Sequence, residues 1–202
     1  MRRVVEVPRL TCLVSDKDDH SLLSALAEAG VDGFQVRAKE YGGRALLALT
    51  ERVLGAVAGS GARVIVNDRL DVALASGAHG VHLGATDLPV ADARRVAPDL
   101  IVGATCRTRE AVVRAALDGA DYAGIGPVFA TTSKAGLPAP IGPAAVAAAA
   151  GVLPLVAIGG IDAERAPRVL LAGAHGVAVI GGIWRHPDPV AAAKELAAAL
   201  GA

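Results

Sequence analysis

The chain has 202 residues, of which 53% are hydrophobic and 2% aromatic, and its 20 lysines and arginines balance its 20 aspartates and glutamates. This length suits one domain with a sizeable core, and the balanced charge gives no global field that would attract nucleic acid or an acidic membrane surface. The two cysteines lack CxxC or Cys/His spacing, which argues against a disulfide framework and a zinc site.

Eight short apolar runs, each followed by a helix-like stretch, form the main pattern of the chain. Every second run is preceded by the same short sequence pattern, which we call the repeated phrase. It consists of a helix end and then a Gly-Ala or similar pair, directly before the run. Nearly continuous apolar runs are typical of parallel strands that helices cover. In chain order the runs and phrases are residues 10–15, 29–36, 63–67, 76–83, 100–104, 118–125, 155–158 and 172–179.

Eight strands that alternate with helices predict a (β/α)8 TIM barrel, a single domain over residues 1–202. An open, doubly wound sheet is the alternative, but no early GxGxxG opens a first strand-to-helix turn. No Ser/Pro-rich linker marks a second domain. The glycine and proline run at 136–143 indicates a long loop that leads into a helix. In such barrels chemistry is carried by the residues that follow the strands.

A row of polar side chains follows the second run, where Gln35, Arg37 and Lys39 alternate with Val36 and Ala38. At strand spacing all three point the same way, toward the mouth of the barrel. Charge at successive positions on one face is costly without a partner anion, so the row predicts an anion site. The alternative is a strand end that runs into a solvated turn.

Two aspartates lie past neighbouring runs, Asp68 directly after Asn67 and Asp87 after the fourth run. Hard oxygen ligands beside cations suit Mg²⁺, which keeps several waters and takes phosphate oxygens from a substrate. Each aspartate could instead be a helix N-cap. The pair predicts a Mg²⁺ site at the barrel mouth.

Glycine pairs follow the seventh and eighth runs, at 159–160 and 181–182, where barrels often bind phosphate through backbone N–H groups. Plain turn glycines are the alternative. Lys134, in the loop after the sixth run, either reaches a phosphate or is solvated.

The motifs at these places resemble those of the thiamine phosphate synthase family and its sister family of thiazole tautomerases. The resemblance extends over nearly the whole chain. It is carried, in this order, by QVRAK at 35–39, VNDR at 66–69, VHLGATD at 81–87, GPVFATTSK at 126–134 and AIGGI at 157–161.

The resemblance implies a transferase that joins hydroxymethylpyrimidine diphosphate to thiazole phosphate, giving thiamine phosphate and pyrophosphate. It implies Mg²⁺ held by Asp68 and Asp87, and Thr105 stands where the family usually has a serine near the pyrimidine and diphosphate. The pyrimidine diphosphate would be held by Gln35, Arg37, Lys39 and Asn67. The thiazole phosphate would be held by Thr131, Thr132, Ser133, Gly160, Ile180 and Gly181.

In that reaction the diphosphate leaves with its electron pair and a resonance-stabilised pyrimidine methyl cation is captured by the thiazole nitrogen. The resemblance implies that Arg37, Lys39 and Lys134, together with Mg²⁺, stabilise the departing charge. No protein nucleophile is then needed, in agreement with the lack of a convincing Ser/His/Asp or Cys/His arrangement.

Several positions depart from the commoner family sequence. Ala85 and Thr86 replace a glutamine and an acidic residue, and Gly181 replaces a frequent serine. A thiazole tautomerase without Mg²⁺, with Cys106 as a base if Arg107 lowered its pKa, is one alternative. The other is a non-catalytic barrel that binds a phosphorylated ligand.

No segment approaches the ~20 apolar residues of a membrane span, and residues 1–8 contain no signal-peptide run. The sequence therefore predicts a cytoplasmic protein whose partners are small phosphorylated molecules, not nucleic acid or membrane. The family resemblance suggests a homo-oligomer. Structural roles are expected for His79 and His175, which enter strands at equivalent positions of the repeated phrase.

Overall fold

The computed structural model describes residues 5–132, 136 and 138–201. Ser133 and Lys134, both predicted to contact phosphate groups, lie outside the described residues.

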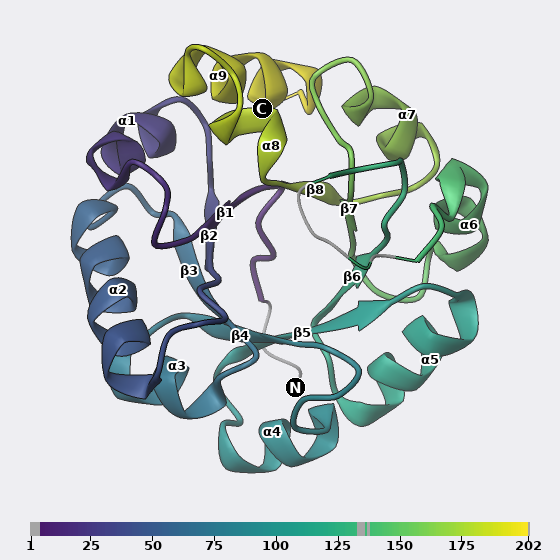
Figure 1. The fold of residues 1–202 in the computed structure, drawn as a ribbon. Coiled ribbons are helices and arrows are strands. Elements are labelled where there is room, and N and C mark those ends of the chain that lie inside the picture. The colour runs from purple at the N-terminus through teal and green to yellow at the C-terminus, as the bar shows by residue number, and fades with distance from the viewer. Residues whose placement is uncertain (1–4, 133–135, 137, 202) are drawn as a thin grey trace.

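Eight parallel strands of the described chain close into one barrel (Figure 1). Each strand pairs with the next in sequence, and β8 pairs with β1, where Leu10 lies opposite Val177. The predicted (β/α)8 barrel is therefore confirmed. The strands are β1 (Leu10–Val14), β2 (Gly33–Val36), β3 (Arg63–Asn67), β4 (Gly80–Leu83), β5 (Ile101–Cys106), β6 (Tyr122–Ile125), β7 (Leu155–Ile158) and β8 (Gly176–Val179).

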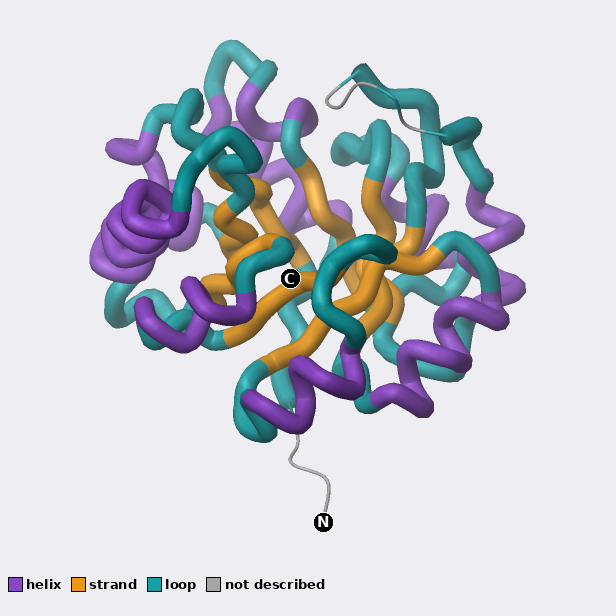
Figure 2. The backbone as a smooth tube through the Cα atoms, turned by 60° about the horizontal axis from the view of Figure 1, so that its bottom comes forward, coloured by secondary structure: helices purple, strands orange, loops and turns teal. Residues whose placement is uncertain are grey.

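Helices surround the barrel on the outside (Figure 2). No helix of the described residues is long and apolar enough to cross a membrane. The helices are η1 (His20–Leu22), α1 (Leu23–Glu28), α2 (Gly43–Ala56), α3 (Leu70–Ser76), α4 (Val90–Val96), α5 (Arg109–Asp118), α6 (Gly142–Ala149), α7 (Ala166–Leu171), α8 (Gly181–Trp184) and α9 (Pro189–Ala199).

Alternation along the strands separates two apolar cores. Side chains such as Phe34 and Val64 face outward and pack in the large core between strands and helices. The inward side chains form a smaller core that fills the amino-terminal part of the barrel. This inner core consists of Leu13, Ile65, Ile101, Tyr122, Val156 and Ala178. The barrel is thus filled at one end, and polar residues at the other end face open space.

The repeated phrase ties each strand to its neighbour. Asp32 accepts hydrogen bonds from the backbone N–H groups of Arg9 and Leu10, at 2.9 and 2.7 Å. At the equivalent position, Nδ1 of His79 accepts from the N–H of Val64 at 3.0 Å. Burial lowers the pKa of His79, which keeps this nitrogen free to accept. The predicted structural role of His79 is confirmed.

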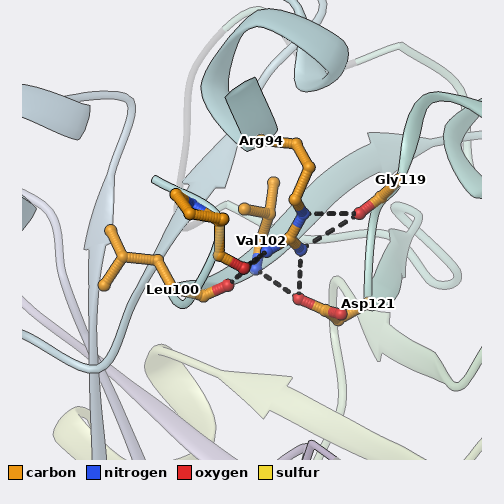
Figure 3. A network of polar contacts seen from close by, with 6 residues as sticks. Arg94, Leu100, Val102, Gly119 and Asp121 are labelled. Atoms are coloured by element: carbon orange, nitrogen blue, oxygen red, sulfur yellow. Dashed lines mark hydrogen bonds and ion pairs between the residues drawn. The ribbon is translucent and has the colours of Figure 1, made fainter. Parts of the chain in front are cut away.

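Asp121 is the third member of this series, and it is part of a wider network (Figure 3). It accepts from the N–H of Val102 at 2.8 Å and from Arg94 Nη2 at 2.6 Å. Arg94 also donates to the carbonyl oxygens of Leu100 and Gly119. One guanidinium therefore joins α4 to the segments that lead into β5 and β6.

Candidate functional site

A cavity of about 720 Å³ opens at the carboxyl ends of the strands. One side is lined by four residues predicted for the pyrimidine diphosphate, and they come from the ends of three strands. These are Gln35 and Arg37 at β2, Asn67 at the end of β3, and Thr105 on β5.

Of the predicted polar row Gln35, Arg37 and Lys39 at β2, only the first two residues line the cavity. Gln35 is buried at 6% exposure and Arg37 is half-buried, and both line the cavity. The Arg37 N–H donates to the Val14 carbonyl at 2.7 Å and so continues the pairing with β1 beyond the strand end. Lys39 does not line the cavity, because the strand has ended at Val36 and the alternation no longer holds there.

Lys39 instead points to the acidic pair. Its Nζ lies 3.3 Å from Oδ2 of Asp68. The carboxyl groups of Asp68 and Asp87 are in hydrogen-bond contact, although they follow different strands. Burial and the Asp87 carboxyl raise the pKa of Asp68 above its usual range, and the Lys39 ammonium opposes this shift. The sequence prediction that these two carboxyl groups converge is confirmed.

Backbone geometry holds both acids in place. Asp68 adopts a left-handed conformation with φ of 65°, and its N–H donates to the carbonyl of His82 on β4 at 2.8 Å. Oδ2 of Asp87 accepts from the N–H of Gly84 at 2.7 Å, and a Cβ on Gly84 would stand only 2.8 Å from that oxygen. The glycine therefore leaves room for the carboxylate.

Asp68 and Asp87 do not line the cavity themselves, but Asn67, the residue before Asp68, does. Two carboxyl groups in contact fit a Mg²⁺ ion that completes its shell with water and phosphate oxygens. The described residues contain no group of three or more acidic, histidine or cysteine side chains that could hold a metal by themselves. Among the described residues, the carboxylate ligands offered to an ion here are therefore those of Asp68 and Asp87.

The opposite side of the cavity is lined by the residues predicted for the thiazole phosphate. They follow β6, β7 and β8 and comprise Thr131, Thr132, Gly160, Ile180 and Gly181. Gly160 has φ of +64°, and a Cβ there would collide with the Ala130 carbonyl oxygen. Only glycine lets the β7 turn lie this close to the segment after β6.

Two arginines hold this side together, and the sequence reading did not identify either of them. Arg165 Nη1 donates to the Gly160 carbonyl at 2.8 Å. Arg185, which follows α8, donates from Nη1 to Oγ1 of Thr132 at 2.6 Å. Both arginines line the cavity, so they add positive charge beside the predicted phosphate site.

A third set of lining residues was also missed. His82 Nε2 lies 2.9 Å from Thr105 Oγ1, and His82 Nδ1 lies 3.0 Å from the Tyr122 hydroxyl. Burial lowers the pKa of His82 to about 4 and raises the pKa of Tyr122. The strand alternation could have found them, because His82 and Tyr122 are polar side chains at inward positions of apolar runs.

Cys106 and Arg107 do not serve the chemistry considered for them. Cys106 is buried and packs in the outer core, and burial raises the pKa of its thiol to about 11. Arg107 donates to the carbonyls of Gly126 and Ala139, at 3.3 and 2.8 Å. Cys106 is therefore a buried core residue that does not fit the alternative role of a base, because burial disfavours its thiolate and its side chain packs in the outer core.

Comparison with known proteins agrees with this geometry. A family model described as thiamine monophosphate synthase matches residues 9–183. A thiamine-phosphate synthase from Chlorobium phaeovibrioides is 43% identical over 192 residues, which cover 93% of this chain and 92% of that protein. The structure of thiamine phosphate pyrophosphorylase from Pyrococcus furiosus superposes with a TM-score of 0.87 at 32% identity, covering 96% and 95% of the two chains.

A longer relative is the thiamine biosynthesis bifunctional protein ThiM/ThiE from Symbiobacterium thermophilum. It is 48% identical over 191 residues, or 93% of this chain. The chain spans only 40% of the length of that relative.

Proposed function

The chain belongs to the thiamine monophosphate synthase family and is a transferase of the thiamine-phosphate synthase kind, and we propose that the barrel-mouth cavity is where it joins its two substrates. The substrates are hydroxymethylpyrimidine diphosphate and thiazole phosphate, and the products are thiamine phosphate and pyrophosphate. One observation carries the proposal. Arg37 and Asn67 line the same cavity as Thr132 and Gly160, so two phosphorylated molecules can be held side by side.

Arg37 and Lys39 would bind the diphosphate group from two sides. The leaving diphosphate gains negative charge as its C–O bond breaks, and fixed cations stabilise that charge. Arg37 reaches it from the cavity wall, and Lys39 reaches it from the acidic pair, 3.3 Å from Asp68. Lys134, predicted to contribute a third cation, lies outside the described residues.

Asp68 and Asp87 would hold Mg²⁺, which, when bound, neutralises charge on the diphosphate oxygens. Support comes from the contact between the two carboxyl groups and from the raised pKa of Asp68, which is expected of a pair without a full counter-charge. Ala85 and Thr86 provide no further carboxylate. The substrate would therefore supply much of the shell of the ion, and the ion and the diphosphate would bind together.

Thr131, Thr132, Gly160, Ile180 and Gly181 would surround the thiazole phosphate. Gly181 offers a backbone donor where the family often has a serine hydroxyl, and Arg165 and Arg185 supply charge nearby. We further propose that the protein works in the cytoplasm as a homo-oligomer, as the family resemblance suggests.

The test is to incubate the purified chain with both substrates and Mg²⁺ and to detect thiamine phosphate by mass. Arg37→Ala is expected to reduce product formation at least a hundredfold with an unchanged circular dichroism spectrum, because Arg37 faces the diphosphate. Arg114→Ala is the matched control, since Arg114 is exposed on α5 and pairs with Asp118 on the same helix. Full activity of Arg37→Ala would contradict the placement of the diphosphate, and no product from the unaltered chain would contradict the function.

A further inference from the structure

A hydrogen-bonded chain of three side chains crosses three neighbouring strands on the inner face of the barrel. It begins at Tyr122 on β6, passes through the ring of His82 on β4 and ends at Thr105 on β5. The two links measure 3.0 and 2.9 Å. Tyr122 is 5% exposed, within the inner apolar core, whereas Thr105 is exposed to the cavity.

Two glycines reserve the space for the rings. A Cβ on Gly103 would overlap the Tyr122 ring, and a Cβ on Gly124 would lie 2.8 Å from Cε1 of His82. Gly103 is the strand partner of both His82 and Tyr122, so the missing side chain leaves the gap that the two rings fill. Any larger residue at 103 or 124 would displace the rings of Tyr122 and His82. The hydrogen-bonded arrangement of these side chains therefore depends on glycine at both positions.

The surroundings of the Tyr122 hydroxyl determine which partner is the donor in each of the two hydrogen bonds. Tyr122 belongs to the inner apolar core together with Leu13 and Val156 and is only 5% exposed, and Nδ1 of His82 lies within hydrogen-bond reach of its hydroxyl. If Nδ1 carried a proton, the tyrosine O–H would lose the acceptor that it has among the described residues, and an unmade hydrogen bond on a largely buried hydroxyl is costly. The tyrosine therefore donates to Nδ1, and His82 carries its proton on Nε2.

With that tautomer, the N–H of His82 Nε2 donates to Thr105 Oγ1, and the hydroxyl proton of Thr105 is left to face the cavity. We propose that Tyr122 and His82 are positioning residues that make Thr105 a hydrogen-bond donor to the pyrimidine diphosphate. This inference rests on the proposed function, in which the pyrimidine diphosphate binds in the cavity that Arg37, Asn67 and Thr105 line. It predicts selectivity for a substrate that presents an acceptor, an oxygen or a ring nitrogen, at this point of the cavity.

A double-mutant cycle in the full-length enzyme tests the proposal. Tyr122→Phe keeps the ring and removes only the hydroxyl, and it is expected to lower kcat/KM for the pyrimidine diphosphate about 3- to 10-fold. The KM for the thiazole phosphate should not change. When Thr105→Val is already present, Tyr122→Phe should cause no further loss, because the hydroxyl that it orients is gone. Thr105→Ser should retain most of the activity.

The tautomer is measured independently by ¹⁵N NMR of the histidine-labelled protein, with the His82 signals assigned by their absence in His82→Gln. An unprotonated Nδ1 and a protonated Nε2 are expected in the unaltered chain. A protonated Nδ1 would overturn the proposal even if Tyr122→Phe failed to fold. Independent, multiplying effects of Tyr122→Phe and Thr105→Val in an active enzyme would also overturn it, whereas an inactive unaltered chain would contradict the proposed function instead.

Discussion

The ammonium group of Lys39 lies 3.3 Å from the carboxylate of Asp68, and this cation faces a carboxyl group that is already in contact with a second one. Burial and the Asp87 carboxyl both raise the pKa of Asp68. In the folded protein without a bound cation, the ionised form of Asp68 is therefore destabilised. A site built to receive a further cation would have this property.

Replacing Asp68 by asparagine is expected to stabilise the apo-protein at neutral pH. Because the folded-state pKa of Asp68 lies above its unfolded value, the wild-type chain loses stability as the pH rises through and above that unfolded value. An asparagine side chain cannot ionise, and this residue type tolerates the left-handed backbone found at Asp68. Urea unfolding at pH 8 should show a higher free energy of unfolding for Asp68→Asn than for the wild-type chain, and this gain should shrink toward pH 4. A loss of stability in Asp68→Asn at pH 8 would contradict an unfavourable interaction between the carboxyl groups of Asp68 and Asp87.

The same substitution is expected to abolish the metal dependence of substrate binding. Calorimetry with hydroxymethylpyrimidine diphosphate should give at least tenfold tighter binding to the unaltered chain when Mg²⁺ is added, because Asp68 and Asp87 would hold an ion that neutralises charge on the diphosphate. Asp68→Asn and Asp87→Asn should each bind weakly, with or without the ion. Metal-independent binding by the unaltered chain would favour a barrel that does not use Mg²⁺.

The Arg94 network is expected to support stability without affecting catalysis. Arg94→Met retains the aliphatic stem but removes the guanidinium donor from the carbonyls of Gly119 and Leu100 and from the Asp121 carboxylate, which keeps the N–H of Val102 (Figure 3). A loss of about 2 to 3 kcal/mol in urea unfolding is predicted, with kcat/KM unchanged at 25 °C. The neighbouring Arg95→Met is the control, since Arg95 is 76% exposed and pairs with Asp92 on the same helix. Its loss should stay below about 0.5 kcal/mol.

His79 is expected to make stability depend on pH. Burial lowers its folded-state pKa below the unfolded value, so its contribution is fully present above that unfolded value and is lost as the pH falls through the folded one. Protonated Nδ1 also could not accept from the N–H of Val64. Unfolding measured between pH 7.5 and 5 should show a decline in the wild-type chain. In His79→Asn, whose oxygen replaces Nδ1 as acceptor, the decline should be smaller, and an equal decline would exclude His79 as its cause.

The sequence by itself determined the barrel and most of its strand positions. Gly77 and Gly119 take the left-handed caps that end α3 and α5, and the apolar runs that follow them become β4 and β6. These are local effects, so they can be read from neighbouring residues. The strand expected to end at residue 104 nevertheless continues to Cys106, because Thr105 and Cys106 pair with Gly124 and Ile125 of the next strand.

Only the tertiary structure decided which side chains meet at the mouth of the barrel. The sequence predicted that Asp68 and Asp87 converge, but the departure of Lys39 from the cavity wall depends on where β2 stops pairing. Likewise, the link from Tyr122 through His82 to Thr105 depends on the register that sets both rings beside Gly103. Register in a closed barrel is fixed by strand tilt and stagger around the whole ring, and no single segment of sequence contains that information.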